Sequence, residues 1–259
     1  MARIFRVLVA ALALGAAGLW GVPARAAVIL IVPATAKTPP IPVYIARPKG
    51  PGPFPAVLLL HGCQGLDGFL TVSADRLVAH GFIGVALDAL GPHGMQTACD
   101  GNSDGDEAGA ARATLAWLRT QPYVAADRLA IVGFSMGADA ALTLIDSHGS
   151  GAPAGLRAVA AYYPSCEDRE GLPTVPLTIF DGDADKVAPF APCAAMVRAG
   201  VAAGKPVTIT TYPGATHGFD VPGPDRMFYD QPIHFDSAAA TDSALQTLRF
   251  LMRYLDANA

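Results

Sequence analysis

The sequence predicts an α/β fold in which helices cover both faces of a mostly parallel, eight-stranded sheet. Short apolar runs alternate with longer segments of helical periodicity, which is typical of parallel strands joined by crossover helices. Runs such as residues 56–60 are apolar at every position, as strands covered on both faces require. Apolar residues make up 52% of the 259 residues and charged residues 15%, which suits a large buried core.

The first 26 residues predict an export signal. Arg3 and Arg6 precede an uncharged apolar run over residues 7–22. Ala24 and Ala26 are small residues at the two positions that signal peptidase recognises before its cleavage site. An uncleaved membrane anchor is the alternative, but the run is shorter than the about 20 residues that a helical span needs. We therefore expect a signal peptide over residues 1–26 and a single domain over residues 27–259. The mature protein is expected to be periplasmic or secreted and to have no membrane partner.

Eight apolar runs predict the strands. The first two runs flank the region around Pro39 and Pro40, and we expect them to pair as an antiparallel edge. No low-complexity linker or internal repeat divides the later runs, which favours one sheet. The predicted strands are residues 28–33, 42–47, 55–61, 82–88, 128–133, 157–163, 175–180 and 206–212.

Helical patterns follow the later strands. In the C-terminal segment Leu245, Leu248 and Leu255 recur at helical spacing, and Asp236 is a suitable N-cap. The sixth and seventh strands are separated by a short connection, so we expect no lid domain. The remaining predicted helices are residues 72–80, 106–119, 136–147 and 191–203.

Ser135 is the predicted nucleophile. Residues 133–137 read G-x-S-x-G between a strand-like run and a helix-like run. In that context the serine lies on a sharp strand-to-helix turn, the nucleophile elbow of serine hydrolases. A serine hydroxyl is a weak nucleophile at neutral pH, so it needs a neighbouring base that a carboxylate orients.

His217 is the predicted base. It follows the strand at residues 206–212, downstream of the serine, in a glycine-containing loop at the carboxyl end of a strand. Ligands of open parallel sheets bind at that edge. The alternative is a solvated loop histidine. His61 also follows a strand and could be read as a base, but we expect it to orient its own loop by hydrogen bonding.

The orienting carboxylate is expected after the strand at residues 175–180. Three aspartates compete there: Asp181, Asp183 and Asp185. We prefer Asp185, because the turn after Gly182 would bring the chain back toward the base, and Asp183 is second. The alternative is that all three are solvated turn formers, a common role of aspartate.

Two backbone amides are expected to form an oxyanion hole. One is the N–H of Met136, the residue after the nucleophile. The other should come from the loop after the third strand, which reads His61-Gly62-Cys63, and Cys63 is the predicted donor.

These motifs together resemble the dienelactone hydrolase family of α/β-hydrolases. The resemblance covers most of residues 54–256 and rests on four segments: His61-Gly62, residues 133–137, the Gly182 to Asp185 turn, and residues 212–219, which read YPGATHGF. It implies an α/β-hydrolase fold and a Ser135–Asp185–His217 triad. Dienelactone hydrolases proper have a cysteine where this chain has Ser135 and a glutamate where Gly62 stands. The chain is therefore similar to the family's exported serine-esterase branch.

The layout of that fold favours two disulfides. After export the four cysteines are an even set in an oxidising compartment. Cys63 and Cys99 follow neighbouring strands, and Cys166 follows the sixth strand while Cys193 begins the helix after the acid loop. We expect the pairs Cys63–Cys99 and Cys166–Cys193. Free buried thiols are the alternative.

The expected pocket is open, with walls from residues 64–70, 91–106, 163–165 and 218–236. Phe219, Met227, Phe228 and Tyr229 lie in the last of these and are candidates for contacting an acyl or leaving group. Ordinary packing beneath a long loop is an equal alternative.

We therefore predict an exported serine hydrolase that cleaves carboxylic esters, and lactones as a related class, through an acyl-enzyme. No metal or organic cofactor is required by this chemistry. The formal charge is −4 without a basic patch, so nucleic acid is not an expected partner. One alternative is a degenerate hydrolase fold that only binds a ligand, and another is an acyltransferase or peptidase with the same triad. The sequence does not indicate an oligomeric state.

Overall fold

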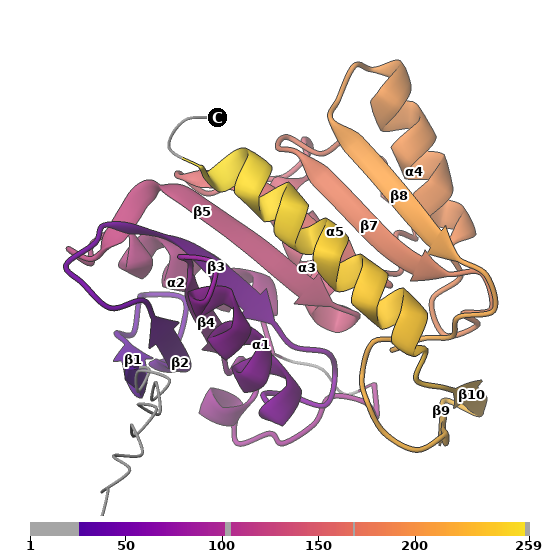
Figure 1. Cartoon of the computed structure of the whole chain (residues 1–259), viewed down its shortest axis with the longest axis horizontal. Coiled ribbons are helices and arrows are strands. Elements are labelled where there is room, and N and C mark those ends of the chain that lie inside the picture. The colour runs from indigo at the N-terminus through magenta and orange to yellow at the C-terminus, as the bar shows by residue number, and fades with distance from the viewer. Residues whose placement is uncertain (1–25, 102–104, 168, 257–259) are drawn as a thin grey trace, which may run out of the picture.

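The computed structural model describes residues 26–101, 105–167 and 169–256, so the predicted signal peptide lies outside the described residues except for the backbone of Ala26. Eight strands form one sheet in the order β1-β2-β4-β3-β5-β6-β7-β8 (Figure 1). β2 runs antiparallel to both of its neighbours, and the other five pairs are parallel. This confirms the eight-stranded, mostly parallel sheet. The strands are β1 Ala26–Val32, β2 Ile41–Arg47, β3 Phe54–Leu60, β4 Ile83–Leu87, β5 Val124–Phe134, β6 Leu156–Tyr162, β7 Leu177–Gly182 and β8 Val207–Tyr212.

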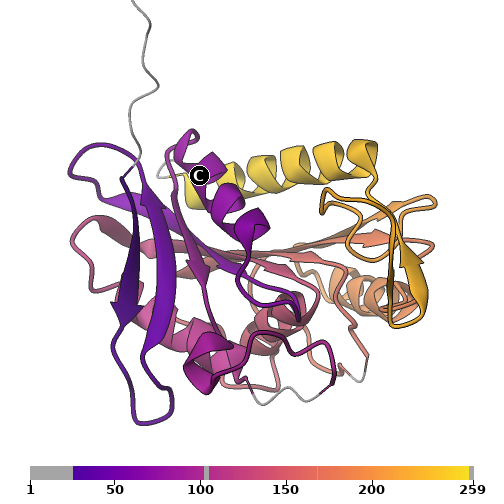
Figure 2. The same cartoon turned by 90° about the horizontal axis from the view of Figure 1, so that it is seen from below.

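Helices cover both faces of the sheet, as expected (Figure 2). One face carries α1, Gly68–Val78, and α5, Ser237–Leu255. The other carries α2, Glu107–Leu118, α3, Met136–Ile145, and α4, Ala191–Ala202.

Two hydrophobic cores result from this layering, because successive side chains of a strand point to opposite faces. In β3, Val57 and Leu59 pack in the core beneath α1 and α5, whereas Leu58 and Leu60 pack in the core beneath the other three helices. Within the described ranges no helix has the length and apolar composition of a membrane span.

Some boundaries differ from the sequence-based prediction. α1 begins at Gly68 rather than near residue 72, because Asp67 caps it: the Asp67 carboxylate accepts a hydrogen bond from the Leu70 N–H at 3.0 Å. The loop predicted over residues 218–236 contains a small hairpin of β9, Arg226–Phe228, and β10, Gln231–Ile233. Strands of three residues are too short for an alternating pattern to be recognised in a sequence.

Both expected cysteine pairs are disulfide-bonded. The Cys63–Cys99 bond links the loop after β3 to the chain that follows β4. The Cys166–Cys193 bond links the chain after β6 to the first turn of α4. No free cysteine remains in the described part of the chain.

Replacing both Cys63 and Cys99 by alanine is expected to lower the free energy of unfolding by about 3–4 kcal/mol, because the bond closes a loop over a sequence separation of 36 residues. Urea denaturation of the oxidised parent and the double variant measures this difference. Alkylation without reductant is the control on the parent. Four modified thiols there, seen by mass spectrometry, would contradict the bonded state.

Candidate active site

Ser135 lies in a sharp turn between β5 and α3. Its φ of 51° and ψ of −118° are unusual for a residue other than glycine, and such strain persists only where the surrounding structure holds it. The two flanking glycines permit the close approach. A Cβ atom on Gly133 would lie 2.4 Å from the Gly137 carbonyl oxygen, and one on Gly137 would lie 2.6 Å from the His61 carbonyl oxygen. The turn therefore requires glycine on both sides of the serine.

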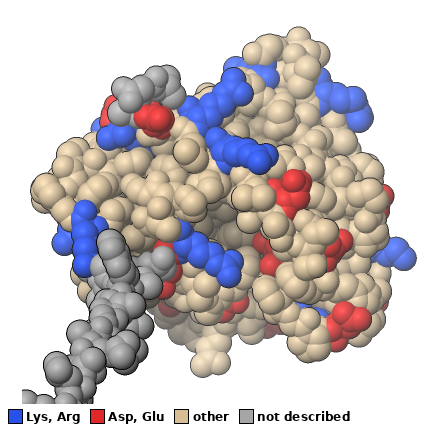
Figure 3. Space-filling view, in the orientation of Figure 1, with Lys and Arg blue, Asp and Glu red and all other residues tan. Residues whose placement is uncertain are grey.

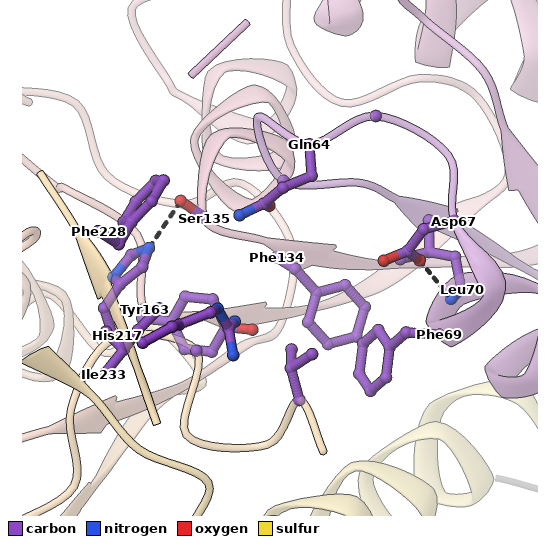
Figure 4. A pocket seen from close by; sticks show the side chains of 15 residues that line it. Gln64, Asp67, Phe69, Leu70, Phe134, Ser135, Tyr163, His217, Phe228 and Ile233 are labelled. Atoms are coloured by element: carbon purple, nitrogen blue, oxygen red, sulfur yellow. Dashed lines mark hydrogen bonds between the residues drawn. The ribbon is translucent and has the colours of Figure 1, made fainter. Parts of the chain in front are cut away.

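The structure brings together the three side chains predicted as the triad. The His217 Nε2 atom lies 2.9 Å from the Ser135 Oγ atom, as the dashed line in Figure 4 marks. The His217 Nδ1 atom lies 2.7 Å from the Asp185 Oδ2 atom. Because a carboxylate accepts hydrogen bonds, Nδ1 carries the proton and Nε2 is free to accept one from the serine hydroxyl. The three residues follow β5, β7 and β8 at the carboxyl edge of the sheet.

Of the three competing aspartates, Asp185 is the one that contacts His217. Its second oxygen, Oδ1, accepts hydrogen bonds from the N–H groups of Val187 and Ala188 at 2.8 and 2.9 Å. These bonds hold the carboxylate in place behind the imidazole. Asp183 instead accepts a hydrogen bond from the Gly214 N–H at 2.6 Å and so joins the loops after β7 and β8.

Asp181 is buried beneath this arrangement. Its Oδ1 atom accepts a hydrogen bond from the Gly182 N–H at 2.9 Å, and its Oδ2 atom has no hydrogen-bond partner. Burial, with a further contribution from the negative charge of Asp185, raises the pKa of Asp181 to about 8. Asp181 is therefore a neutral acid at neutral pH.

Replacing Asp181 by asparagine is expected to stabilise the protein in a pH-dependent manner. In the unfolded chain the aspartate loses its proton near its ordinary pKa of 3.8, whereas the folded protein keeps that proton until about pH 8. Raising the pH between these values therefore favours unfolding of the parent. The difference in unfolding free energy between variant and parent should be negligible near pH 4 and on the order of 2–4 kcal/mol at pH 8. Urea denaturation at the two pH values tests this, and an equal difference at both would contradict it.

Two aromatic rings flank the His217 imidazole. The Tyr163 ring lies 4.7 Å from it, centroid to centroid, and the Phe228 ring stacks on it at 5.9 Å with an interplanar angle of 9°. The Tyr163 hydroxyl donates a hydrogen bond to the buried Asp220 at 2.7 Å. Burial raises the pKa of Asp220 to about 6, although the bond from Tyr163 opposes this change. The two rings restrict the imidazole to a narrow space beside the serine.

His61 orients the loop after β3, as expected, and is not placed as a base. Its fully buried ring donates a hydrogen bond from Nδ1 to the Gly62 carbonyl at 2.8 Å, and its Nε2 accepts one from the Ala89 N–H at 3.1 Å. Burial lowers the pKa of His61, which fits a neutral ring. The buried Glu107 carboxyl lies 3.6 Å from Nδ1, and burial raises the pKa of that carboxyl well above its usual value.

The loop that His61 holds lies beside the serine. A Cβ atom placed on Gly62 would be 3.7 Å from the Ser135 Cβ atom. The Gln64 side chain extends toward Ser135 in Figure 4. On the other side Met136 is the first residue of α3, so that helix begins directly after the nucleophile. The loop and the helix start therefore both present backbone to the space around the serine hydroxyl.

A cavity of about 160 Å³ opens in front of Ser135. Two of the predicted walls, residues 64–70 and 218–236, contribute to it, and so does Tyr163, whereas residues 91–106 are absent from its lining. The lining residues are Gly62, Gln64, Gly65, Asp67, Phe69, Leu70, Phe134, Ser135, Tyr163, His217, Gly218, Val221, Arg226, Phe228 and Ile233.

The four apolar candidates of the long loop have different roles. Phe228 lines the cavity, but Phe219 is fully buried in the core beneath α5. Met227 and Tyr229 are exposed and do not contact the cavity. Phe134 was missed by sequence reasoning. Its place directly before the nucleophile, at the x of G-x-S, is the signal that could have identified it.

Comparisons with known proteins bear on the family and the fold of the chain. The sequence profile of the dienelactone hydrolase family matches residues 41–255. A search of curated protein sequences found no match. Among solved structures, a Klebsiella pneumoniae protein assigned as a dienelactone hydrolase is similar at 21% identity, covering 89% of this chain and 100% of that chain with a TM-score of 0.70.

Two further solved structures share the fold. A thermophilic esterase from Thermogutta terrifontis with bound propionate is 17% identical and covers 88% of this chain and 94% of that chain, with a TM-score of 0.67. A dienelactone hydrolase-like promiscuous phosphotriesterase from metagenomic libraries is 18% identical and covers 90% and 99%, with a TM-score of 0.67.

Proposed function

Because the chain belongs to the dienelactone hydrolase family, a family of hydrolases, we propose that it is a serine hydrolase that cleaves carboxylic esters through an acyl-enzyme on Ser135. The observation that carries the proposal is the hydrogen-bonded series from Ser135 through His217 to Asp185 at the edge of a cavity. Esters, with lactones as a related class, are the proposed small-molecule substrates.

In the first step His217 takes the proton of Ser135 as the Oγ atom attacks the ester carbonyl carbon. The imidazolium that forms is stabilised by the negative charge of Asp185, whose Oδ2 atom already accepts a hydrogen bond from Nδ1–H, with 2.7 Å between the two heavy atoms. His217 then gives its proton to the departing alcohol, and the acyl group remains on Ser135. A water molecule, activated by His217 in the same way, releases the acid.

The negative oxygen of each tetrahedral intermediate is proposed to be bound by the N–H groups of Met136 and Cys63. In support of this, α3 begins at Met136, directly after the nucleophile, and the positive end of a helix dipole favours negative charge near a helix start. The Cys63–Cys99 bond and the His61 hydrogen bonds hold the loop after β3, which carries Cys63. Preorganised donors of this kind stabilise charge in the transition state without rearrangement.

Export remains part of the proposal. The apolar run at residues 7–22 supports a signal peptide over residues 1–26, and the two disulfides support an oxidising compartment outside the cytoplasm. The catalytic unit is then one domain over residues 27–259.

The proposal is tested by a substrate panel and a covalent probe. The protein is expected to hydrolyse 4-nitrophenyl acetate, and a fluorophosphonate should label the peptide that contains Ser135. A protein that neither turns over any ester, lactone or amide nor reacts with the probe is a binding module. Transfer of the acyl group to added alcohols or peptides, in preference to water, would instead identify an acyltransferase.

A further inference from the structure

A second, larger cavity lies on the sheet face that carries α1 and α5. Leu59 and Val132 of the sheet form its floor, Leu77 lies on the α1 side, and Leu245 and Leu248 lie on the α5 side. The volume is about 480 Å³, and most of the lining side chains are apolar. Figure 3 shows the surface hollowed between the two helices. We call this cavity the α1–α5 groove.

The groove shares a wall with the cavity at Ser135. Phe69 and Phe134 line both, and their rings are in edge-to-face contact at 5.2 Å between centroids. The chain after His217 also separates the two spaces: Val221 lines the catalytic cavity, and Pro222 lines the groove. Ser135 itself lines only the catalytic cavity, so the groove is separated from the reacting atom by this wall of two aromatic rings.

The two cavities differ in the size of molecule that they can hold. Pockets for small ligands have volumes of roughly 300–1,000 Å³, and the groove at about 480 Å³ falls in that range, whereas the catalytic cavity at about 160 Å³ does not. A short acyl group fits the catalytic cavity alone. A longer one extends beyond that cavity, either into water or into the neighbouring groove.

The groove exposes apolar surface that a ligand would cover. Phe235 and Leu245 line it with exposed fractions of 38% and 46%. Large exposed apolar side chains gathered along a cavity indicate binding. Basic and acidic residues in the lining are few: Arg76, His80 and Asp220. The Asp220 carboxylate already accepts a hydrogen bond from the Tyr163 hydroxyl. The chemistry of the groove therefore matches an uncharged hydrocarbon chain.

We propose that the α1–α5 groove binds the apolar acyl chain of the ester, so that the substrates are medium-chain esters rather than acetates. This inference rests on the proposed function. Within α1 the lining residues extend from Phe69 to Leu77, which is roughly 12 Å along the helix at about 1.5 Å per residue. Each methylene group buried there should favour the longer ester by about fourfold in kcat/KM.

The test fills the groove at one position on α5. Ala244 lines the groove and is exposed, so a tryptophan there occupies the groove without entering the core. Ala238 is exposed on the same helix outside every cavity described above, so Ala238→Trp is the matched control. The ratio of kcat/KM for 4-nitrophenyl octanoate to that for the acetate should fall by about tenfold or more in Ala244→Trp, mainly through KM. In Ala238→Trp it should equal the parent ratio.

A second groove variant keeps the proposal testable if Ala244→Trp does not fold. Leu245→Glu places a charge at an exposed groove position and should produce the same selective loss on octanoate. Equal ratios in the parent and both groove variants, with acetate hydrolysis intact, would overturn the groove assignment and leave the proposed function standing. If the parent hydrolysed neither ester, both the groove assignment and the proposed function would be refuted. The groove variants could instead lose kcat/KM on both esters and sediment with a lower molecular mass than the parent. That result would identify the groove as a contact between copies of the chain and would also overturn the proposal.

Discussion

Replacing Ser135 by alanine is expected to abolish the hydrolysis of 4-nitrophenyl acetate, with kcat lower by a factor on the order of 10⁴–10⁶. The variant lacks the Oγ atom that attacks the ester, while the neighbouring amides and the cavity remain. Its folded structure should be unaffected, because alanine and serine have similar backbone preferences at the strained turn. Initial rates at saturating ester measure the effect, and the midpoint of thermal unfolding verifies the fold.

Ser237→Ala is the matched control for this experiment. Ser237 is exposed at the start of α5, outside the catalytic cavity, so its loss should leave kcat unchanged. Full activity in Ser135→Ala would refute the assignment of the nucleophile. Loss of activity together with a large fall in the unfolding midpoint would instead indicate a structural role for the serine.

Replacing Asp185 by asparagine is expected to lower kcat by a factor on the order of 10³–10⁴ with a much smaller change in KM. An amide at this position carries no charge to stabilise the imidazolium. It can also hold the imidazole in the wrong tautomer, with Nδ1 unprotonated and Nε2 unable to accept the serine proton. Initial rates of ester hydrolysis over a range of ester concentrations give kcat and KM for the variant and the parent.

The chain supplies a matched control two residues away. In Asp183→Asn the side-chain oxygen can still accept the hydrogen bond from the Gly214 N–H, so kcat should stay within about threefold of the parent. Comparable losses in the two variants would mean that the loop as a whole, rather than the carboxylate on His217, supports the reaction. A loss in Asp183→Asn alone would transfer the role of acid to Asp183.

One property of parallel sheets allowed both the strands and the reacting side chains to be predicted from the sequence. Buried parallel strands have continuous apolar runs, and polar side chains that directly follow such runs meet at one edge of the sheet. Ser135 directly follows β5 in this way, and His217 lies five residues after the end of β8. The choice among the aspartates was harder, because β7 continues to Gly182 and so includes Asp181, which an apolar pattern does not reveal.

The remaining features depend on packing that a single sequence does not encode locally. The side chains of Phe219 and Phe228 are similar in type and lie in one loop, yet one is in the core and the other is in the cavity. The short strands β9 and β10 lie beside the catalytic cavity, which is lined by Arg226, Phe228 and Ile233. The α1–α5 groove arises from the spacing between two helices that are distant in the sequence.

The two disulfides have a practical consequence for preparing this protein. Both bonds are made by chain segments that border the reacting residues, one beside the Gly62 loop and one just after Tyr163. Recombinant expression in a reducing host cytosol would leave those segments untethered even where the sheet itself assembles. Specific activity should therefore be measured on material oxidised in the bacterial periplasm or refolded with a glutathione couple, since otherwise a weak enzyme and an incompletely oxidised one give the same assay result.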